Sequence, residues 1–111
     1  MIKALVIDFA HTNRLSKYLE KKGCSVLSEQ EDGARAYRLS GESIPDLIVV
    51  DYQQKASHGR QTASAIHQRK KTAHIPIYFV DGAPEENQKV EGIGKCIRSE
   101  EIDRILEQKE K

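Results

Sequence analysis

The feature that most constrains the fold of this chain is a regular alternation of short apolar runs with stretches of helical periodicity. The clearest runs cover residues 4–7, 47–50 and 77–80, and they consist largely of β-branched and other apolar residues. Continuous apolar runs of this length indicate strands that are covered on both faces. Strands that alternate with helices are typical of a parallel sheet with right-handed crossovers and helices on both sides. The alternation therefore predicts a three-layer α/β fold.

The segments between the strong runs supply the remaining expected elements. Thr12 or Asn13 can cap a helix that ends at Gly23, and Asp32 with Gly33 introduces a second helix that ends near Gly41. The polar stretch 53–59 is expected to be a loop, followed by helices over 61–71, 85–90 and from residue 99 onward, and by weaker strands over 25–28 and 93–97.

Length and charge limit the classes of function. A chain of 111 residues has room for one core, so residues 1–111 are expected to form a single domain. Lys and Arg number 18 against 17 Asp and Glu, and this balance favours neither a nucleic-acid nor a membrane partner. The first apolar run is too short for a signal sequence or a membrane span. Cys24 and Cys96 lack a metal-binding spacing, and we expect reduced thiols in a cytoplasmic protein.

Three acidic residues directly follow the predicted strands. Asp8 comes after the first run, Asp51 after the strongest run and Asp81 after the run that ends at Val80. In open parallel sheets, binding and catalytic groups gather outside the carboxyl ends of the strands. We therefore expect the three carboxyl groups to lie at one edge of the sheet, where they form the candidate functional site.

The stretch Pro45-Asp46-Leu47-Ile48-Val49-Val50-Asp51-Tyr52, followed by Gly59, resembles the core of the response-regulator receiver family. Asn13-Arg14, Asp32-Gly33 and Ser99-Glu100-Glu101-Ile102 occur in the family's order, and the resemblance covers nearly the whole chain. It implies a flavodoxin-like, receiver-type sandwich with a five-stranded parallel sheet in the order 2-1-3-4-5. It also implies that Asp51 is the phosphoacceptor for a partner histidine kinase.

The candidate metal ligands depart from the receiver pattern. Receivers usually carry two adjacent acids after the first strand, but here Asp8 is followed by Phe9. Asp8 and Asp51 remain as candidate ligands for Mg²⁺. Because Mg²⁺ requires oxygen ligands in near-octahedral order, the loss of one acid is expected to weaken its binding.

The candidate phosphoryl contacts depart from the pattern as well. Asp81 stands where receivers usually have Thr or Ser. Two unit charges about 4 Å apart repel by roughly 4 kcal/mol at an effective dielectric constant near 20, so a phosphorylated Asp51 facing Asp81 is disfavoured unless a cation bridges them. The resemblance implies that Lys95 is the lysine that contacts the phosphoryl group. The short separation of Asp81 from Lys95 predicts a shortened fourth helix.

Three hypotheses of function follow. The first, which we favour, is a stand-alone, non-enzymatic receiver-like domain that binds another signalling protein, a kinase or an effector, without being phosphorylated. The second is a genuine response-regulator receiver phosphorylated on Asp51. The third is a small metal-dependent enzyme that uses Asp8, Asp51 and Asp81 as a carboxylate cluster. The sequence leaves the oligomeric state and the identity of the partner open.

Overall fold

The computed structural model describes residues 1–110, with the backbone alone for Glu110. Strands and helices alternate along these residues. The strands are β1 (Lys3–Ile7), β2 (Ser25–Glu29), β3 (Leu47–Asp51), β4 (Ile77–Val80) and β5 (Lys95–Ile97). The helices are α1 (Arg14–Lys21), α2 (Gly33–Ser43), α3 (Ala56–Gln68), α4 (Pro84–Asn87) and α5 (Ile102–Glu110), with short 3-10 turns η1 (Gln88–Val90) and η2 (Ser99–Glu101).

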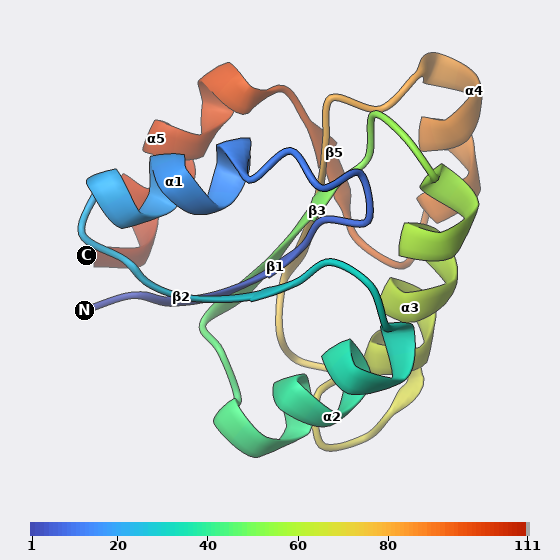
Figure 1. Cartoon of the computed structure of the whole chain (residues 1–111), viewed down its shortest axis with the longest axis horizontal. Helices are drawn as coiled ribbons and strands as arrows, with labels where there is room; N and C mark the ends of the chain where they lie inside the picture. Colours follow the sequence, from blue (N-terminus) through green and yellow to red (C-terminus); the bar gives the residue numbers. More distant parts are fainter. Residues whose placement is uncertain (111) are drawn as a thin grey trace.

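The strands form one parallel sheet in the order β2-β1-β3-β4-β5, which confirms the predicted order. Helices α1 and α5 cover one face of the sheet, and α2 and α3 cover the other (Figure 1). Side chains from alternate positions of each strand enter the two cores: Leu5 and Ile7 pack beneath α2 and α3, while Ala4 and Val6 pack beneath α1 and α5. The three-layer α/β prediction is therefore confirmed.

The predicted loop over residues 53–59 is wrong in its second half. Helix α3 begins at Ala56, and Gly59 lies within it. Glycine normally disfavours a helix interior, which is why this segment looked like a loop. Here a Cβ at Gly59 would lie 3.0 Å from Cγ1 of Val50, so glycine allows α3 to approach β3 closely.

The predicted shortening of the fourth helix is confirmed. Helix α4 has 4 residues and continues into the 3 residues of η1, whose Val90 is fully buried. The chain then reaches β5 through Gly94, where an added Cβ would lie 2.4 Å from the carbonyl oxygen of Ile77. A short segment thus covers the β4 and β5 end of the sheet. None of the helices within residues 1–110 has the length and apolar character needed to cross a membrane.

Candidate functional site

The three acids that follow the strands lie at one edge of the sheet, as predicted. Asp51 is the last residue of β3 and is 3% exposed, and Asp8 follows β1 and is 1% exposed. Asp81 follows β4 in a left-handed backbone conformation (φ 59°) and is half-buried. Buried carboxylates need hydrogen-bond donors or cations, because an unpaired charge loses the solvation that water gives it. The partners of each acid therefore define what the site can do.

The Arg14 side chain bridges Asp51 and Asp81. Its Nε lies 3.0 Å from Oδ2 of Asp51, its Nη2 lies 3.0 Å from Oδ1 of Asp51, and its Nη1 lies 2.9 Å from Oδ2 of Asp81. Arg14 is the first residue of α1, which begins beside the carboxyl ends of the strands. Because a planar guanidinium matches a carboxylate with two parallel hydrogen bonds, this contact fixes the direction of the Asp51 side chain.

Asp51 has a further donor in Thr12, whose Oγ1 donates a hydrogen bond of 2.9 Å to Oδ2. Oδ2 of Asp51 therefore accepts hydrogen bonds from Thr12, in the loop that joins β1 to α1, and from Arg14, while Oδ1 accepts one from Arg14 at the start of α1. Arg14 keeps 31% of its side chain exposed, so solvent reaches the outer side of this contact.

Asp81 is held ionised by its surroundings. Burial opposes its ionisation, but the Ser99 backbone N–H, 3.0 Å from Oδ1, and the Arg14 guanidinium more than offset this effect. The pKa of Asp81 consequently lies below its ordinary value. Arg98, which follows β5, adds a second cation, with its Nε 3.6 Å from Oδ1 of Asp81. Arg14 from α1 and Arg98 from the end of β5 thus offset the repulsion between the carboxylates of Asp51 and Asp81.

Asp8 accepts hydrogen bonds from uncharged donors, two of which lie in the loop between β1 and α1. Its Oδ1 accepts a hydrogen bond of 3.2 Å from the Thr12 N–H, and its Oδ2 accepts one of 2.8 Å from the Asn13 N–H. Gln30 Nε2 also donates to Oδ2 at 3.2 Å and to the Asn13 side chain at 2.6 Å. These contacts give Asp8 a structural role, because they fix a loop in which His11 and Asn13 both have positive φ.

The residues at this edge do not fit a Mg²⁺ ion. Mg²⁺ prefers oxygens that are free to coordinate it, but every carboxylate oxygen of Asp8 and Asp51 already accepts a hydrogen bond from an N–H or O–H donor. Phe9, which stands where the receiver pattern has an acid, is 4% exposed and packs against His58 with the rings tilted by 49° and their centroids 4.1 Å apart. Within residues 1–110, no three His, Cys, Asp and Glu side chains are grouped so that they could hold a metal ion.

Lys95, the predicted phosphoryl contact, is not brought into this cluster. It opens β5 opposite Tyr78 and is exposed, whereas the cluster lies beyond the other end of the strand, where Ile97 is followed by Arg98. The predicted site thus assembles around Asp8, Asp51 and Asp81, while its cations are Arg14 and Arg98.

Sequence reasoning missed the role of Arg14. The signal that could have identified it is electrostatic: two acids at the ends of adjacent strands require a cation, and Arg14 stands in the first turn of the helix that begins at the same edge of the sheet. The sequence does not reveal which of the nearby cations reaches both acids, because that depends on the path of the loop between β1 and α1.

Comparisons with known proteins show which proteins this chain resembles. No family model matches the chain. It is 32% identical over 89 residues to the protein-glutamate methylesterase/protein-glutamine glutaminase of Halobacterium salinarum, a match that covers 78% of this chain and 25% of that protein. It is 29% identical over 91 residues to the phosphate regulon transcriptional regulatory protein PhoB of Rhizobium meliloti, covering 81% of this chain and 40% of that protein. The chain thus spans less than half the length of these curated relatives.

Solved structures show the same fold. The chemotaxis response regulator CheY4 of Vibrio cholerae superposes with a TM-score of 0.75 at 21% identity, covering 98% of each chain. The N-terminal domain of a response regulator receiver protein from Methanoculleus marisnigri superposes with a TM-score of 0.70 at 20% identity, covering 97% of this chain and 92% of that one. The chain therefore has the receiver-domain fold of response regulators, as its sequence resemblance implies.

Proposed function

We propose that this chain is a receiver-fold signalling domain that acts through protein–protein contacts and does not accept a phosphoryl group at Asp51. The observation that supports this proposal most directly is the Arg14 guanidinium, which donates to both oxygens of Asp51. A carboxylate that attacks a phosphorus atom must offer a lone pair, and charge-assisted hydrogen bonds to both oxygens reduce its nucleophilicity. The residues are therefore arranged to keep Asp51 as a buried counter-ion.

The charge of the neighbouring groups supports the same proposal. A phosphoryl group on Asp51 would add negative charge beside Asp81, whose lowered pKa keeps it ionised. The hydroxyl that receivers place at this position is absent, and the donors on Asp8 and Asp51 leave no oxygen directed toward a magnesium ion. The missing hydroxyl removes a group that would stabilise the added charge, and the ionised Asp81 places a like charge beside it.

A second candidate function is phosphorylation of Asp51. It is favoured by the position of Asp51 at the carboxyl end of β3 and by the partial exposure of Arg14, which could turn toward solvent and contact a phosphoryl oxygen. The third candidate, a metal-dependent enzyme built on Asp8, Asp51 and Asp81, is opposed by the cation that already joins two of these acids.

Intact-mass measurement after incubation with acetyl phosphate and MgCl₂ tests the proposal. We expect no increase by the mass of a phosphoryl group, since the guanidinium occupies both oxygens of Asp51. The variant Asp51→Asn is the matched control for modification at other sites, and a receiver with a conventional acidic site is the positive control. An adduct on the natural chain that disappears in Asp51→Asn would establish the second candidate in place of the first.

A further inference from the structure

The part of the chain around α3 has an unusual charge distribution. Although the whole sequence has a net charge of +1, residues 52–80 contain no Asp or Glu at all. They carry five cations, which are Lys55, Arg60, Arg69, Lys70 and Lys71. This segment includes all of α3 and the turns at both of its ends. Where these cations are exposed, they raise the local concentration of acidic partners.

Helix α3 presents an uncharged face toward solvent between these cations. Its exposed or half-buried residues Ser57, Gln61, Ser64, Ala65 and Gln68 recur at intervals of three and four positions, so they share one side of the helix. We call this set the α3 stripe. An exposed helix face in a chain with 32% charged residues normally carries several charges. The α3 stripe carries none, and uncharged side chains cost less to desolvate than ionised ones.

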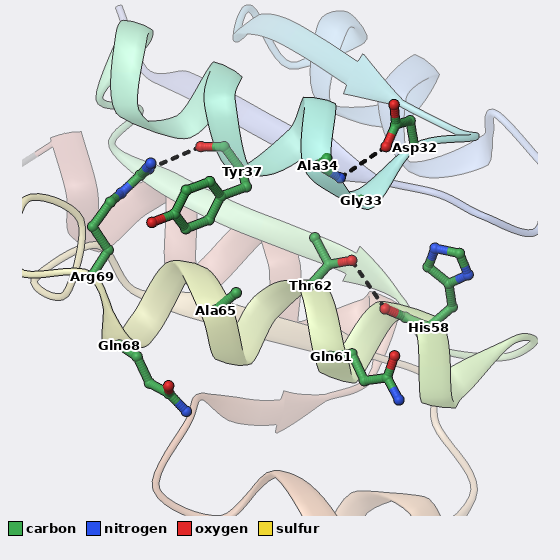
Figure 2. Close-up of a pocket in the computed structure, with 10 residues that line it drawn as sticks. All are labelled: Asp32, Gly33, Ala34, Tyr37, His58, Gln61, Thr62, Ala65, Gln68 and Arg69. Carbon is green, nitrogen blue, oxygen red and sulfur yellow. Dashed lines mark hydrogen bonds between the residues drawn. The ribbon is translucent and has the colours of Figure 1, made fainter.

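The α3 stripe is bordered by two hollows. A groove of about 760 Å³ lies between α2 and α3, where Tyr37, Thr62 and Ala65 face the space between the two helices (Figure 2). A second hollow of about 450 Å³ lies on the other side of α3, bounded by Arg60 and Ile93. A ridge with a hollow on each side is a shape into which a helix or an extended segment can pack.

The cations at the two ends of the α3 stripe are available to a partner. Arg60 pairs with Glu86, and Arg69 is engaged in donating to the Tyr37 carbonyl and the Ser40 hydroxyl. By contrast, Lys55, Lys70 and Lys71 are exposed and make no ion pair with the described residues. Lys55 precedes α3, and Lys70 and Lys71 follow it, so the unpaired charges flank an uncharged centre.

We propose that the α3 stripe and its flanking lysines form a docking surface for an acidic segment of a partner protein. The complementary segment carries small or uncharged side chains in its middle and acidic side chains at both ends, about 20 Å apart, which is the span of α3. The inference rests on the protein-interaction part of the proposed function, but it does not depend on whether Asp51 is phosphorylated.

Charge argues against a second copy of this chain as the occupant. If two α3 helices paired antiparallel, Lys55 of one copy would approach Lys70 and Lys71 of the other, and a parallel pairing would place each cation against its equivalent. Either arrangement sets like charges together, which destabilises an interface. A nucleic acid is disfavoured because its evenly spaced phosphates would meet the uncharged centre of the stripe.

A designed peptide of known composition tests the docking surface. The probe has three glutamates at each end and an Ala/Ser/Gln centre, and the control peptide has lysines in place of the glutamates. We expect saturable amide shifts in ¹⁵N NMR spectra at α3 and the α2 side of the groove, and none with the lysine peptide. The double variant Lys70→Glu/Lys71→Glu should bind about tenfold more weakly. The matched control Lys17→Glu/Lys21→Glu, which reverses two exposed charges on α1, should bind as the natural chain does.

Other results would overturn the inference. In the NMR titration, these are the absence of saturable shifts, or shifts centred outside α3. In the comparison of variants, the contrary result is an equal loss of binding in both double variants. Tighter binding of a single-stranded DNA oligonucleotide than of the acidic peptide, or dimerisation through α3 in size-exclusion chromatography, would point to another occupant. If Lys70→Glu/Lys71→Glu does not fold, Gln68→Glu supplies the measurement, since it places a like charge in the stripe and should also weaken binding. The phosphoryl-transfer assay is independent of every one of these results.

Discussion

At the scale of single residues, Arg14 is the side chain on which the site depends. It satisfies a buried carboxylate and a half-buried one through three hydrogen bonds. Buried charges repay their desolvation cost through such bonds, and removing one partner leaves the other uncompensated. The energetic importance of Arg14 therefore lies less in the attraction itself than in what would remain without it, namely two anions at adjacent strand ends.

Replacing Arg14 with methionine tests this interpretation. Arg14→Met should lower the free energy of unfolding by about 2–3 kcal/mol, because it removes the cation that pairs with the buried Asp51 carboxylate while it keeps an aliphatic side chain. Adding Asp51→Asn should recover part of this loss, and the double-mutant cycle from urea denaturation should give a coupling of about 1 kcal/mol or more.

Arg35→Met is the matched control for Arg14→Met, because Arg35 pairs with Glu29 while keeping 61% of its side chain exposed. It should cost less than about 1 kcal/mol. Equal losses in the two variants would show that the position of Arg14 at the strand ends confers no special energetic role.

Asp81 makes stability depend on pH in a defined direction. Because its pKa is lowered in the folded chain, the unfolded chain binds more protons in the acid range, and stability falls as pH falls below about 4. In Asp81→Asn, the acid limb of the unfolding free energy against pH should be shallower, although stability at neutral pH is lower. Glu100→Gln, which removes a carboxylate that is 75% exposed, should leave the slope unchanged. An unaltered slope in Asp81→Asn would contradict the assignment.

At the scale of elements, sequence patterns predicted most of the fold but placed some boundaries wrongly. The continuous apolar runs located β1, β3 and β4, because their side chains are buried on both faces. The start of α3 was missed, because Gly59 carries a packing requirement that local propensity does not contain. For the site, strand ends located the acids. They did not locate Arg14, because its reach depends on the path of the loop between β1 and α1. They did not exclude Lys95, because its position depends on the register of β5 against β4.

The short connection into β5 depends on Gly94. Gly94→Ala should lower the free energy of unfolding by about 3 kcal/mol, because the new methyl group meets the Ile77 backbone carbonyl, which cannot rotate away as a side chain can. Gly92→Ala is the comparison: Gly92 has φ +85° with no atom near its Cβ position, so its cost should be the backbone strain of about 1 kcal/mol. Urea denaturation measures both. A smaller loss at Gly94 than at Gly92 would show that β5 can shift outward.

At the scale of the whole molecule, the fold is that of receiver domains, and the acids at the edge of its sheet are paired with cations. The cations that face the acids belong to the chain itself: Arg14 comes from α1 and Arg98 follows β5. The Arg14 guanidinium also joins the start of α1 to the ends of β3 and β4.

Magnesium should therefore not stabilise the folded chain. A ligand that binds only the folded state raises the unfolding temperature as its concentration exceeds its dissociation constant. We expect no saturable rise in Tm with MgCl₂ up to about 10 mM, beyond the change that NaCl of equal ionic strength produces. A saturable rise that is abolished in Asp8→Asn would show that an ion displaces the hydrogen bonds on the acids.

The internal counter-ion has a consequence for how such a domain could be controlled. Under the proposed function, neither a kinase nor a phosphatase switches the domain through Asp51. Under the proposed function, its influence on a partner would follow its cellular abundance and the competition for that partner. Regulation would then act through synthesis and degradation, on the timescale of gene expression.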